Sequence, residues 1–468
     1  MIKLFFKFSY GSFLAAGISL FTTPVITALI IPEDFGKAAM FTLIYSLLLQ
    51  FFLLGIDQSY VRYFYTKTDK NYKSELLLNS VYATILATFI GILLILLFKR
   101  YISEQILGEY SLKIIIILTV TLVVGVFERF TGLLLRMQQK ASQYSLLKLV
   151  AAVVTFAVTY FYAVLVKADF YALVYANIVS LLICAVIGWL MGYNYWNKKI
   201  PVNRSMIKEI TLYGLPFVPT FMASWLFEGV DKLMLRHFAT YQEVGLFSAS
   251  FKFVAMLSIL QLAFSAFWIP VSMELYEKNS SEAAQKFSKA LSFVSTFLFI
   301  GAVAVLLCKD LIMLLFDKSY DEAVYIMPFL LFIPVMFTLS EITVGGINYS
   351  KKTYWHFVIA VATALLNVLL NYFLIPKFGA RGAALSTGLS YILFFALRTI
   401  ISNKYFQLKI NYAKIGFSIF VFFCAAYLNT FFVLKYDFLI NALGILILAI
   451  IFREDLKVGL RTYILKKQ

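Results

Sequence analysis

The chemically informative residues of this sequence are a few charged side chains within long apolar runs. Four of them lie close together in one run: Glu228, Asp231, Lys232 and Arg236. Spacings of three and four residues bring side chains to one face of a helix, and Glu228 with Lys232 has the spacing of a helical ion pair. The pattern predicts a charged path through an apolar layer. The alternative is a helix extension whose charges, above all that of Arg236, are solvated.

Four further charges interrupt apolar runs: Glu128, Arg129, Lys252 and Glu341. An ionisable group at the centre of a bilayer costs about 2.5–3.5 kcal/mol, so each of them is a candidate functional residue. Arg129 and Lys252 are cations in different halves of the chain, which suits the binding of a phosphorylated anion. Lys252 has no acidic residue within a helical turn. For Glu128, pairing with a neighbouring helix is the alternative.

Two asparagines, Asn367 and Asn371, are four residues apart and would share a helix face. They predict either the lining of a polar path or hydrogen bonds between helices. The three cysteines and two histidines are isolated from one another. The sequence therefore predicts no metal site and no cofactor.

The elements that must position these residues are membrane-spanning helices. Hydrophobic residues make up 62% of the 468 residues and charged residues 14%, against roughly 25% charged residues in soluble domains. Uncharged runs approach or exceed the roughly 20 residues that a helix needs to cross a bilayer, and they lack the alternation of barrel strands. We expect an all-α polytopic membrane protein with about 14 transmembrane helices. The first apolar run is too long for a signal peptide and is expected to be retained.

The net charge of +17 indicates orientation in the membrane rather than a nucleic-acid partner. With the N-terminus placed inside, most of the 41 Lys and Arg residues fall in cytoplasmic loops and tails. This distribution is the positive-inside bias of membrane proteins. The sequence therefore predicts cytoplasmic N- and C-termini, with basic loops that attract anionic membrane lipids.

The sequence also predicts two similar halves. Segments of the first half match segments of the second in the same order, at an offset of about 203–211 residues. Residues 34–36 match residues 243–245, and residues 170–180 match residues 378–390. Parallel six-helix repeats are typical of alternating-access transporters, whose substrate lies between the halves; a duplicated scaffold without transport is the alternative. The expected domains are an N-lobe of spans 1–6 (1–200), a C-lobe of spans 7–12 (201–405) and a C-terminal helix pair with a basic cytoplasmic tail (406–468).

Three groups of motifs occur in order along the chain. They are Gly55 to Tyr65; Tyr213 to Phe217 with Asp231-Lys232 and Glu243 to Ser248; and Ile375 to Ala384. Together they resemble the polysaccharide and oligosaccharide flippases of the MATE-like exporter superfamily, and the resemblance covers essentially the whole chain. The resemblance implies a bacterial plasma-membrane protein. It would move an undecaprenyl-pyrophosphate-linked oligosaccharide to the outer leaflet, for capsule, O-antigen or a related surface polysaccharide.

The resemblance further implies alternating access of the two lobes, a proton or sodium ion as coupling ion, and other polysaccharide-assembly proteins as partners. It places Asp57 and Arg62 at the cytoplasmic mouth and Asp231 in the seventh span. Many relatives end after twelve spans, so the extra helix pair leaves the subfamily open. The acidic pattern of cation-coupled drug exporters is not clear in this sequence, which puts ion coupling in doubt.

These observations assign roles to the candidate residues. For substrate binding we expect Arg129, Lys252 and Arg236 to attract the pyrophosphate or acidic sugars, with Asn367 and Asn371 on the polar path. The expected gate or ion-coupling residues are Asp57, Arg62, Glu128, Glu228, Asp231, Lys232 and Glu341.

Two other functions compete with the flippase. A multidrug exporter of the same superfamily would favour acidic cavity residues, whereas cations here at least match acids in number. A membrane enzyme acting on the same lipid-linked sugars usually needs a sizeable outer loop. The longest outer stretches of this chain are short and carry no catalytic constellation, so the sequence predicts that the protein is not an enzyme.

Overall fold

The computed structural model of the chain describes residues 2–198, 200–278, 280–314, 316–432 and 436–457. Within these ranges, the side chains of residues 2–13, 16, 20, 223–224, 226–228, 256, 266 and 280–281 are not described. The described chain is helical and contains no strand. The expectation of an all-α protein is confirmed.

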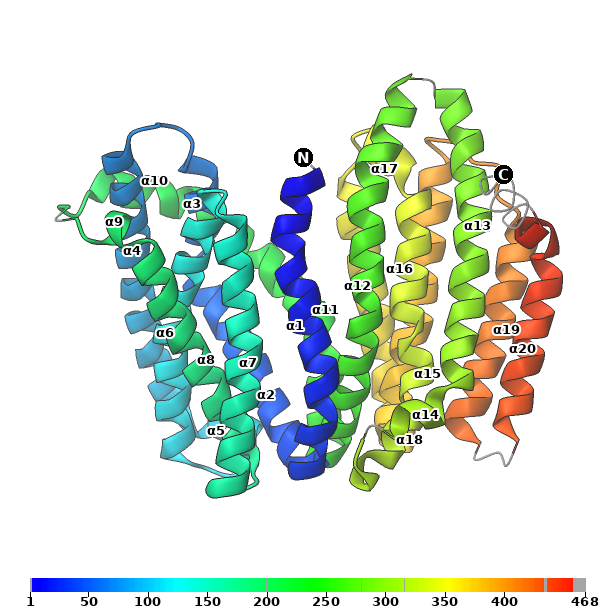
Figure 1. The fold of residues 1–468 in the computed structure, drawn as a ribbon, viewed down its shortest axis with the longest axis horizontal. Helices are drawn as coiled ribbons and strands as arrows, with labels where there is room; N and C mark the ends of the chain where they lie inside the picture. Colours follow the sequence, from blue (N-terminus) through cyan, green and yellow to red (C-terminus); the bar gives the residue numbers. More distant parts are fainter. Residues whose placement is uncertain (1, 199, 279, 315, 433–435, 458–468) are drawn as a thin grey trace. The chain divides into compact units, whose positions relative to one another are not determined.

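The helices form two compact units, which divide between Arg236 and His237 (Figure 1). Unit 1 is Met1–Arg236 and unit 2 is His237–Gln468. The helices of unit 1 are α1 (Ile2–Leu29), α2 (Pro32–Phe52), α3 (Ile56–Tyr63), α4 (Lys70–Leu97), α5 (Lys99–Leu107), α6 (Leu112–Met137), α7 (Ala141–Leu165), α8 (Phe170–Met191), α9 (Tyr193–Trp196), α10 (Arg204–Gly214) and α11 (Phe217–Phe238), whose end passes the boundary. The helices of unit 2 are α12 (Tyr241–Lys278), α13 (Ser280–Leu307), α14 (Lys309–Met313), the 3-10 helix η1 (Lys318–Tyr325), α15 (Met327–Leu330), α16 (Phe332–Thr343), α17 (Gly345–Tyr349), α18 (Tyr354–Asn403), α19 (Tyr412–Phe431) and α20 (Asp437–Ile451). The expected lobe boundaries at residues 200 and 405 stay predictions.

Most of the long helices are suited to cross a membrane. Nine helices of the described chain are long and apolar enough, and a tenth span results if the bent pair Lys318–Tyr325 and Met327–Thr343 counts as one. The part of α1 from Gly17 to Leu29 and the 15-residue helix α20 are also apolar. The chain is therefore a multi-span membrane protein, and its expected count of about 14 spans stays a prediction.

Unit 1 is built around α6, α7 and α8, which pack against one another, with α1 on α7 and α2 on α6 and α8. Tyr60 of α3, Phe64 and Phe130 of α6 are fully buried, and the rings of Tyr60 and Phe130 meet edge to face at 6.0 Å. Lipid tails are as apolar as these side chains, so close packing rather than hydrophobic burial holds the helices together.

In unit 2, α16 packs against α18, and the C-terminal helices α19 and α20 pack against α13. Polar contacts fix that pair: Asn441 of α20 donates to the Leu306 carbonyl oxygen at 3.2 Å and exchanges hydrogen bonds with Asn429 of α19. Lys309 lies 2.7 Å from the Asp437 carboxylate at the start of α20. Because both ends of these contacts are shielded from water, they anchor α19 and α20 specifically.

A related placement occurs in both units between the segments that the sequence matched. In unit 1 the Asp34 carboxyl group lies near the backbone N–H of Phe170, at the start of α8. In unit 2 the Glu243 carboxylate accepts a hydrogen bond from the backbone N–H of Ala380 at 2.7 Å. Ala380 begins the second part of α18, just after the break at Gly379, whose φ is 54°. A carboxylate at a helix start satisfies an otherwise unpaired N–H group and opposes the positive end of the helix dipole.

Candidate functional site

The candidate site of unit 1 begins at a break between α2 and α3. Leu54 and Gly55 adopt left-handed φ angles of 49° and 68°, which end the first helix and start the second. The Gly55 backbone lies against the Gly214 backbone at the end of α10, and a Cβ atom on either glycine would overlap the other segment. The hydroxyl of Ser59 on α3 donates to the Ile210 carbonyl oxygen at 2.5 Å, which fixes α3 across α10.

This break places Asp57 in the first turn of α3, where it meets Arg129 of α6. The guanidinium donates to Oδ2 of Asp57 from Nη2 at 2.6 Å and from Nε at 3.2 Å. Gln58 donates to the same oxygen at 3.0 Å. Asp57 is 2% exposed, whereas the Arg129 side chain is 42% exposed. The structure therefore pairs a buried carboxylate with a cation that remains accessible.

A cavity of about 250 Å³ adjoins this pair. Asp57 and Arg129 line it together with the polar side chains of Tyr45, Ser46 and Gln50. The Tyr45 hydroxyl lies over Gly125, one helical turn before Arg129, where any larger side chain would displace it. Because Gly125 has no side chain, the Tyr45 hydroxyl has room to lie at this place.

The chemistry of this cavity suits an anion. Arginine presents five N–H donors in a planar fork that matches carboxylate and phosphate oxygens. Asp57 occupies the Nε–Nη2 edge of the Arg129 guanidinium, and Arg129 lines the cavity together with the hydroxyl and amide side chains of Tyr45, Ser46 and Gln50. The carboxylate holds the cation in place at an apolar depth where an unpaired charge would be costly.

Helix α11 contacts α2 and α5 and holds the charge cluster that the sequence singled out. Trp225 Nε1 donates to the Leu43 carbonyl oxygen at 3.0 Å and lies 3.1 Å from the Ser46 hydroxyl. Asp231 is buried, and Arg236 donates from Nη2 to the Glu104 carbonyl oxygen of α5 at 3.1 Å. Arg236 therefore ties α11 to α5, and its role in substrate binding stays a prediction.

The other candidate charges of unit 1 do not line the cavity as it is described. Arg62 is exposed on α3, and Lys232 on α11 is partly buried. Glu128 is partly buried beside Arg129, and its backbone carbonyl accepts from the Thr131 hydroxyl. The side chain of Glu228 falls outside the described residues. Their gating or coupling roles stay predictions.

In unit 2 the candidate polar residues lie on separate helices. Lys252 is partly buried on α12. Asn367 and Asn371 are buried on α18, and the Asn371 amide donates to Oδ1 of Asn367 at 3.0 Å. This bond lies within one helix, whereas the sequence predicts a polar path or bonds between helices.

Unit 2 contains a buried ion pair that sequence reasoning missed in part. Arg398 of α18 lies 3.0 Å from the Glu341 carboxylate of α16 and donates to the Ser340 hydroxyl at 2.6 Å. Its guanidinium also lies beside the stacked rings of Phe337 and Phe394, 5.6 and 5.0 Å from their centres. Of this pair, the sequence singles out Glu341 but not Arg398. Unlike the Arg129 side chain, that of Arg398 is only 8% exposed, so this pair is buried where two helices pack.

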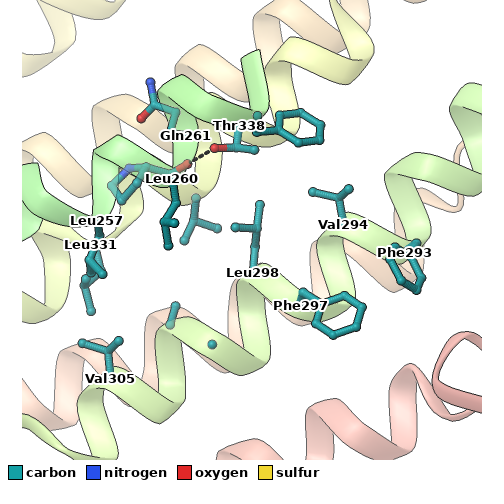
Figure 2. A pocket seen from close by; sticks show the side chains of 15 residues that line it. Leu257, Leu260, Gln261, Phe293, Val294, Phe297, Leu298, Val305, Leu331 and Thr338 are labelled. Carbon is teal, nitrogen blue, oxygen red and sulfur yellow. Dashed lines mark hydrogen bonds between the residues drawn. The ribbon is translucent and has the colours of Figure 1, made fainter. Parts of the chain in front are cut away.

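A second cavity, of about 350 Å³, lies in unit 2 between α12, α13 and the α15–α16 segment. Figure 2 shows its walls, with Leu257 and Leu260 from α12 opposite Val294, Leu298 and Val305 from α13. Thr338 contributes a hydroxyl, which donates to the Pro334 carbonyl oxygen at 2.6 Å. This cavity is apolar, in contrast to that of unit 1. Among the described residues, no group of three or more His, Cys, Asp or Glu side chains could hold a metal ion.

Comparison with known proteins gives relatives of one kind. Residues 4–276 match the family model described as "Polysaccharide biosynthesis protein". The chain is 24% identical over 422 residues to an uncharacterized membrane protein of Methanocaldococcus jannaschii, covering 84% of this chain and 82% of that protein. It is 21% identical over 250 residues to a probable low-salt glycan biosynthesis flippase of Haloferax volcanii, covering 53% of this chain and 52% of that protein.

Solved structures of similar fold include two transporters. The lipid II flippase MurJ in an inward closed conformation superposes with a TM-score of 0.69 at 17% identity, covering 97% of this chain and 99% of that chain. An inward-facing multidrug resistance MATE family transporter of the MOP superfamily gives a TM-score of 0.63 at 12% identity, covering 83% and 94%. At these identities the likeness establishes the fold. Since the family model spans more than half of the sequence, the chain belongs to the polysaccharide biosynthesis protein family and has the MATE-like fold.

Proposed function

We propose that the protein is a flippase that moves an undecaprenyl-pyrophosphate-linked oligosaccharide across the plasma membrane. The observation that carries the proposal is the Arg129 side chain, which is 42% exposed and is held by Asp57 at the edge of a polar cavity. A diphosphate offers several anionic oxygens to the N–H fork of an arginine. The hydroxyl and amide groups of Tyr45, Ser46 and Gln50 would bind the phosphates or the first sugar.

The comparisons support this direction. The family is one of polysaccharide biosynthesis, one relative is named as a probable glycan biosynthesis flippase, and the MurJ structure is named as a lipid II flippase. We infer that this chain handles a lipid-linked saccharide of the same general class, for a surface polysaccharide such as capsule or O-antigen. The two solved structures are named as a flippase and a transporter, and we propose that this chain likewise performs no catalysis.

The exchange of a partner at Arg129 suggests how binding begins. In the structure, Asp57 satisfies one edge of the guanidinium. An incoming diphosphate competes for that edge, and its greater charge favours the exchange. The freed Asp57 would then be a buried carboxylate that has lost its cation, which favours a rearrangement around the α2–α3 break. Alternating access of two lobes, driven by a proton or sodium ion, would complete the movement.

The setting of this activity also belongs to the proposal. We place both termini in the cytoplasm, from the positive-inside distribution, and the protein in a bacterial plasma membrane beside other polysaccharide-assembly proteins. Both curated relatives named above come from archaea, so the alternative host membrane is an archaeal one. Either membrane would present anionic lipids to the basic loops.

The structural likeness to a MATE transporter favours one second candidate, a multidrug exporter. Cationic drugs are bound by accessible carboxylates. In the described cavity of unit 1 the lining carboxylate, Asp57, is buried against Arg129, which leaves a cationic rather than an anionic face. The geometry therefore favours an anionic substrate.

The test is transport of a fluorescent lipid-diphosphate oligosaccharide in reconstituted vesicles. Arg129→Gln should lower the rate at least about tenfold, because losing one charged hydrogen-bonded contact costs about 1.5–3 kcal/mol. Arg136→Gln is the matched control, since Arg136 is exposed on the same helix and does not line the cavity. Equal rates for the two variants would refute the proposed site. Normal polysaccharide with altered drug resistance in a deletion strain would favour the exporter.

A further inference from the structure

The apolar cavity of unit 2 is not used by the head-group site proposed above. It forms where α12, α13 and α16 pack against one another, and its volume is about 350 Å³. Ligand sites in proteins commonly have volumes of about 300–1,000 Å³, with mostly apolar walls. The cavity is therefore large enough to bind a small ligand or part of a larger one.

The walls select against polar ligands. No charged residue lines the described cavity, and its polar side chains are Gln261 and Thr338. The Thr338 hydroxyl already donates to the Pro334 carbonyl oxygen. The Gln261 amide is directed away from Leu298, which lies on the opposite wall of the cavity (Figure 2). A sugar, a phosphate or a peptide would lose its hydration here, and the Gln261 amide and the Thr338 hydroxyl could replace only a small part of its hydrogen bonds. A hydrocarbon chain has no hydrogen bonds to lose when it enters the cavity.

The cavity also lies at a depth that a lipid chain reaches. Its walls belong to the apolar segments Leu257–Lys278 and Glu282–Leu307, both of which are candidate membrane spans. Leu260 is 70% exposed and Phe297 58%, so the cavity has an open side. At Gly301 on its wall, an added Cβ atom would meet nothing within 4 Å. The space beside Gly301 is thus free for an occupant.

We propose that this cavity binds a segment of the isoprenoid chain of the lipid-linked substrate. The inference rests on the proposed function, which supplies a substrate with such a chain. At the roughly 30 Å³ that a small group such as water takes in a liquid, the cavity holds on the order of ten carbon groups. Methyl branches make an isoprenoid chain wider than a straight acyl chain. A wider chain fills a broad cavity walled by aromatic and branched side chains with more close contacts.

The first test fills the cavity from its own wall. Gly301→Leu places a side chain in the open space and should weaken binding of a polyprenyl phosphate at least about tenfold, the effect of unburying about two methylene groups. Gly416→Leu is the matched control. Gly416 is also an exposed helical glycine of unit 2 with nothing within 4 Å, it lies on α19, and it does not line the cavity. Both substitutions raise helix propensity equally.

The second test identifies the occupant by photo-crosslinking. A diazirine-labelled polyprenyl phosphate should label peptides that contain Phe264, Phe297 or Val335 in the full-length protein. Excess unlabelled polyprenyl phosphate should abolish the labelling, and excess phosphatidylglycerol should not. Equal competition by phosphatidylglycerol would overturn the proposal and assign the cavity to bulk lipid. Labelling elsewhere alone, or equal binding by the two leucine variants, would also overturn it.

A third measurement separates this inference from the proposed function. Binding of a water-soluble sugar diphosphate, which has no isoprenoid chain, reads the head-group site of unit 1 alone. Gly301→Leu should leave it unchanged, whereas Arg129→Gln should weaken it. If Gly301→Leu binds both the soluble ligand and the polyprenyl phosphate normally, the proposed site for the isoprenoid chain is refuted while the proposed function stands. If Arg129→Gln binds the soluble ligand normally, the head-group site fails.

Discussion

Removing Arg129 should destabilise the protein more than removing both members of its ion pair. In Arg129→Gln, the Asp57 carboxylate keeps its 2% exposure but loses both donors of the guanidinium. Breaking a fully buried pair in this way costs about 3–5 kcal/mol. The Arg129 side chain is 42% exposed, so water can replace part of the lost interaction, and we expect about 2 kcal/mol.

Asp57→Asn in the same chain removes the buried negative charge while keeping the size of the side chain. The double variant Asp57→Asn/Arg129→Gln should therefore recover about 1–2 kcal/mol of the loss, a coupling within the range measured for residues in contact. Glu104→Gln combined with Arg129→Gln is the control, because Glu104 pairs with Arg100 on the surface of α5. The losses in free energy of unfolding caused by these two substitutions should be additive.

The assay is thermal unfolding of the purified variants in one detergent, followed by intrinsic fluorescence and by the loss of helical circular dichroism. Arg129→Gln should lower the unfolding temperature by a few degrees, and the double variant should lie between it and the wild type. A double variant that is no more stable than Arg129→Gln would refute the reasoning. Asp57 would then not be a charge that depends on Arg129 for its burial.

Two more predictions concern unit 2. Arg398→Gln should destabilise the protein by about 3–5 kcal/mol, more than Arg129→Gln, because both side chains of its pair are at most 11% exposed; an equal or smaller fall in unfolding temperature would contradict this. Gly379→Ala should cost about 1–2 kcal/mol, since φ at this position is 54°, whereas Gly416→Ala in regular helix should be neutral or stabilising. Similar unfolding temperatures for the two alanine variants would show that the break at Gly379 is not strained by a side chain.

The membrane class and the helical fold could be predicted because they depend on composition and local pattern. Long uncharged runs leave few alternatives to helices in lipid, where each backbone polar group must be paired within the chain. The matched segments around Asp34 and Glu243 were also visible, and both residues lie near a helix start, where Glu243 accepts a hydrogen bond. A short acidic motif before a span is a local signal, so sequence comparison could find it.

The partners of the candidate charges could not be predicted in the same way. Asp57 and Arg129 were assigned to separate roles, a gate and a substrate contact, yet they are hydrogen-bonded to each other. Arg398 was passed over although it is the partner of Glu341. Each pair joins residues of different helices, and nothing in the local pattern of one helix specifies which helix packs against it.

The sequence by itself thus determined that the chain spans the membrane many times and carries a small set of charges at apolar depth. Tertiary structure decided which charges are neutralised and which remain accessible. The left-handed turn at Leu54-Gly55 brings Asp57 to Arg129, whose side chain stays 42% exposed beside a polar cavity. The packing of α16 on α18 buries Arg398 with Glu341 instead. The two arginines are chemically identical, and the difference in their exposure arises from the helices around them.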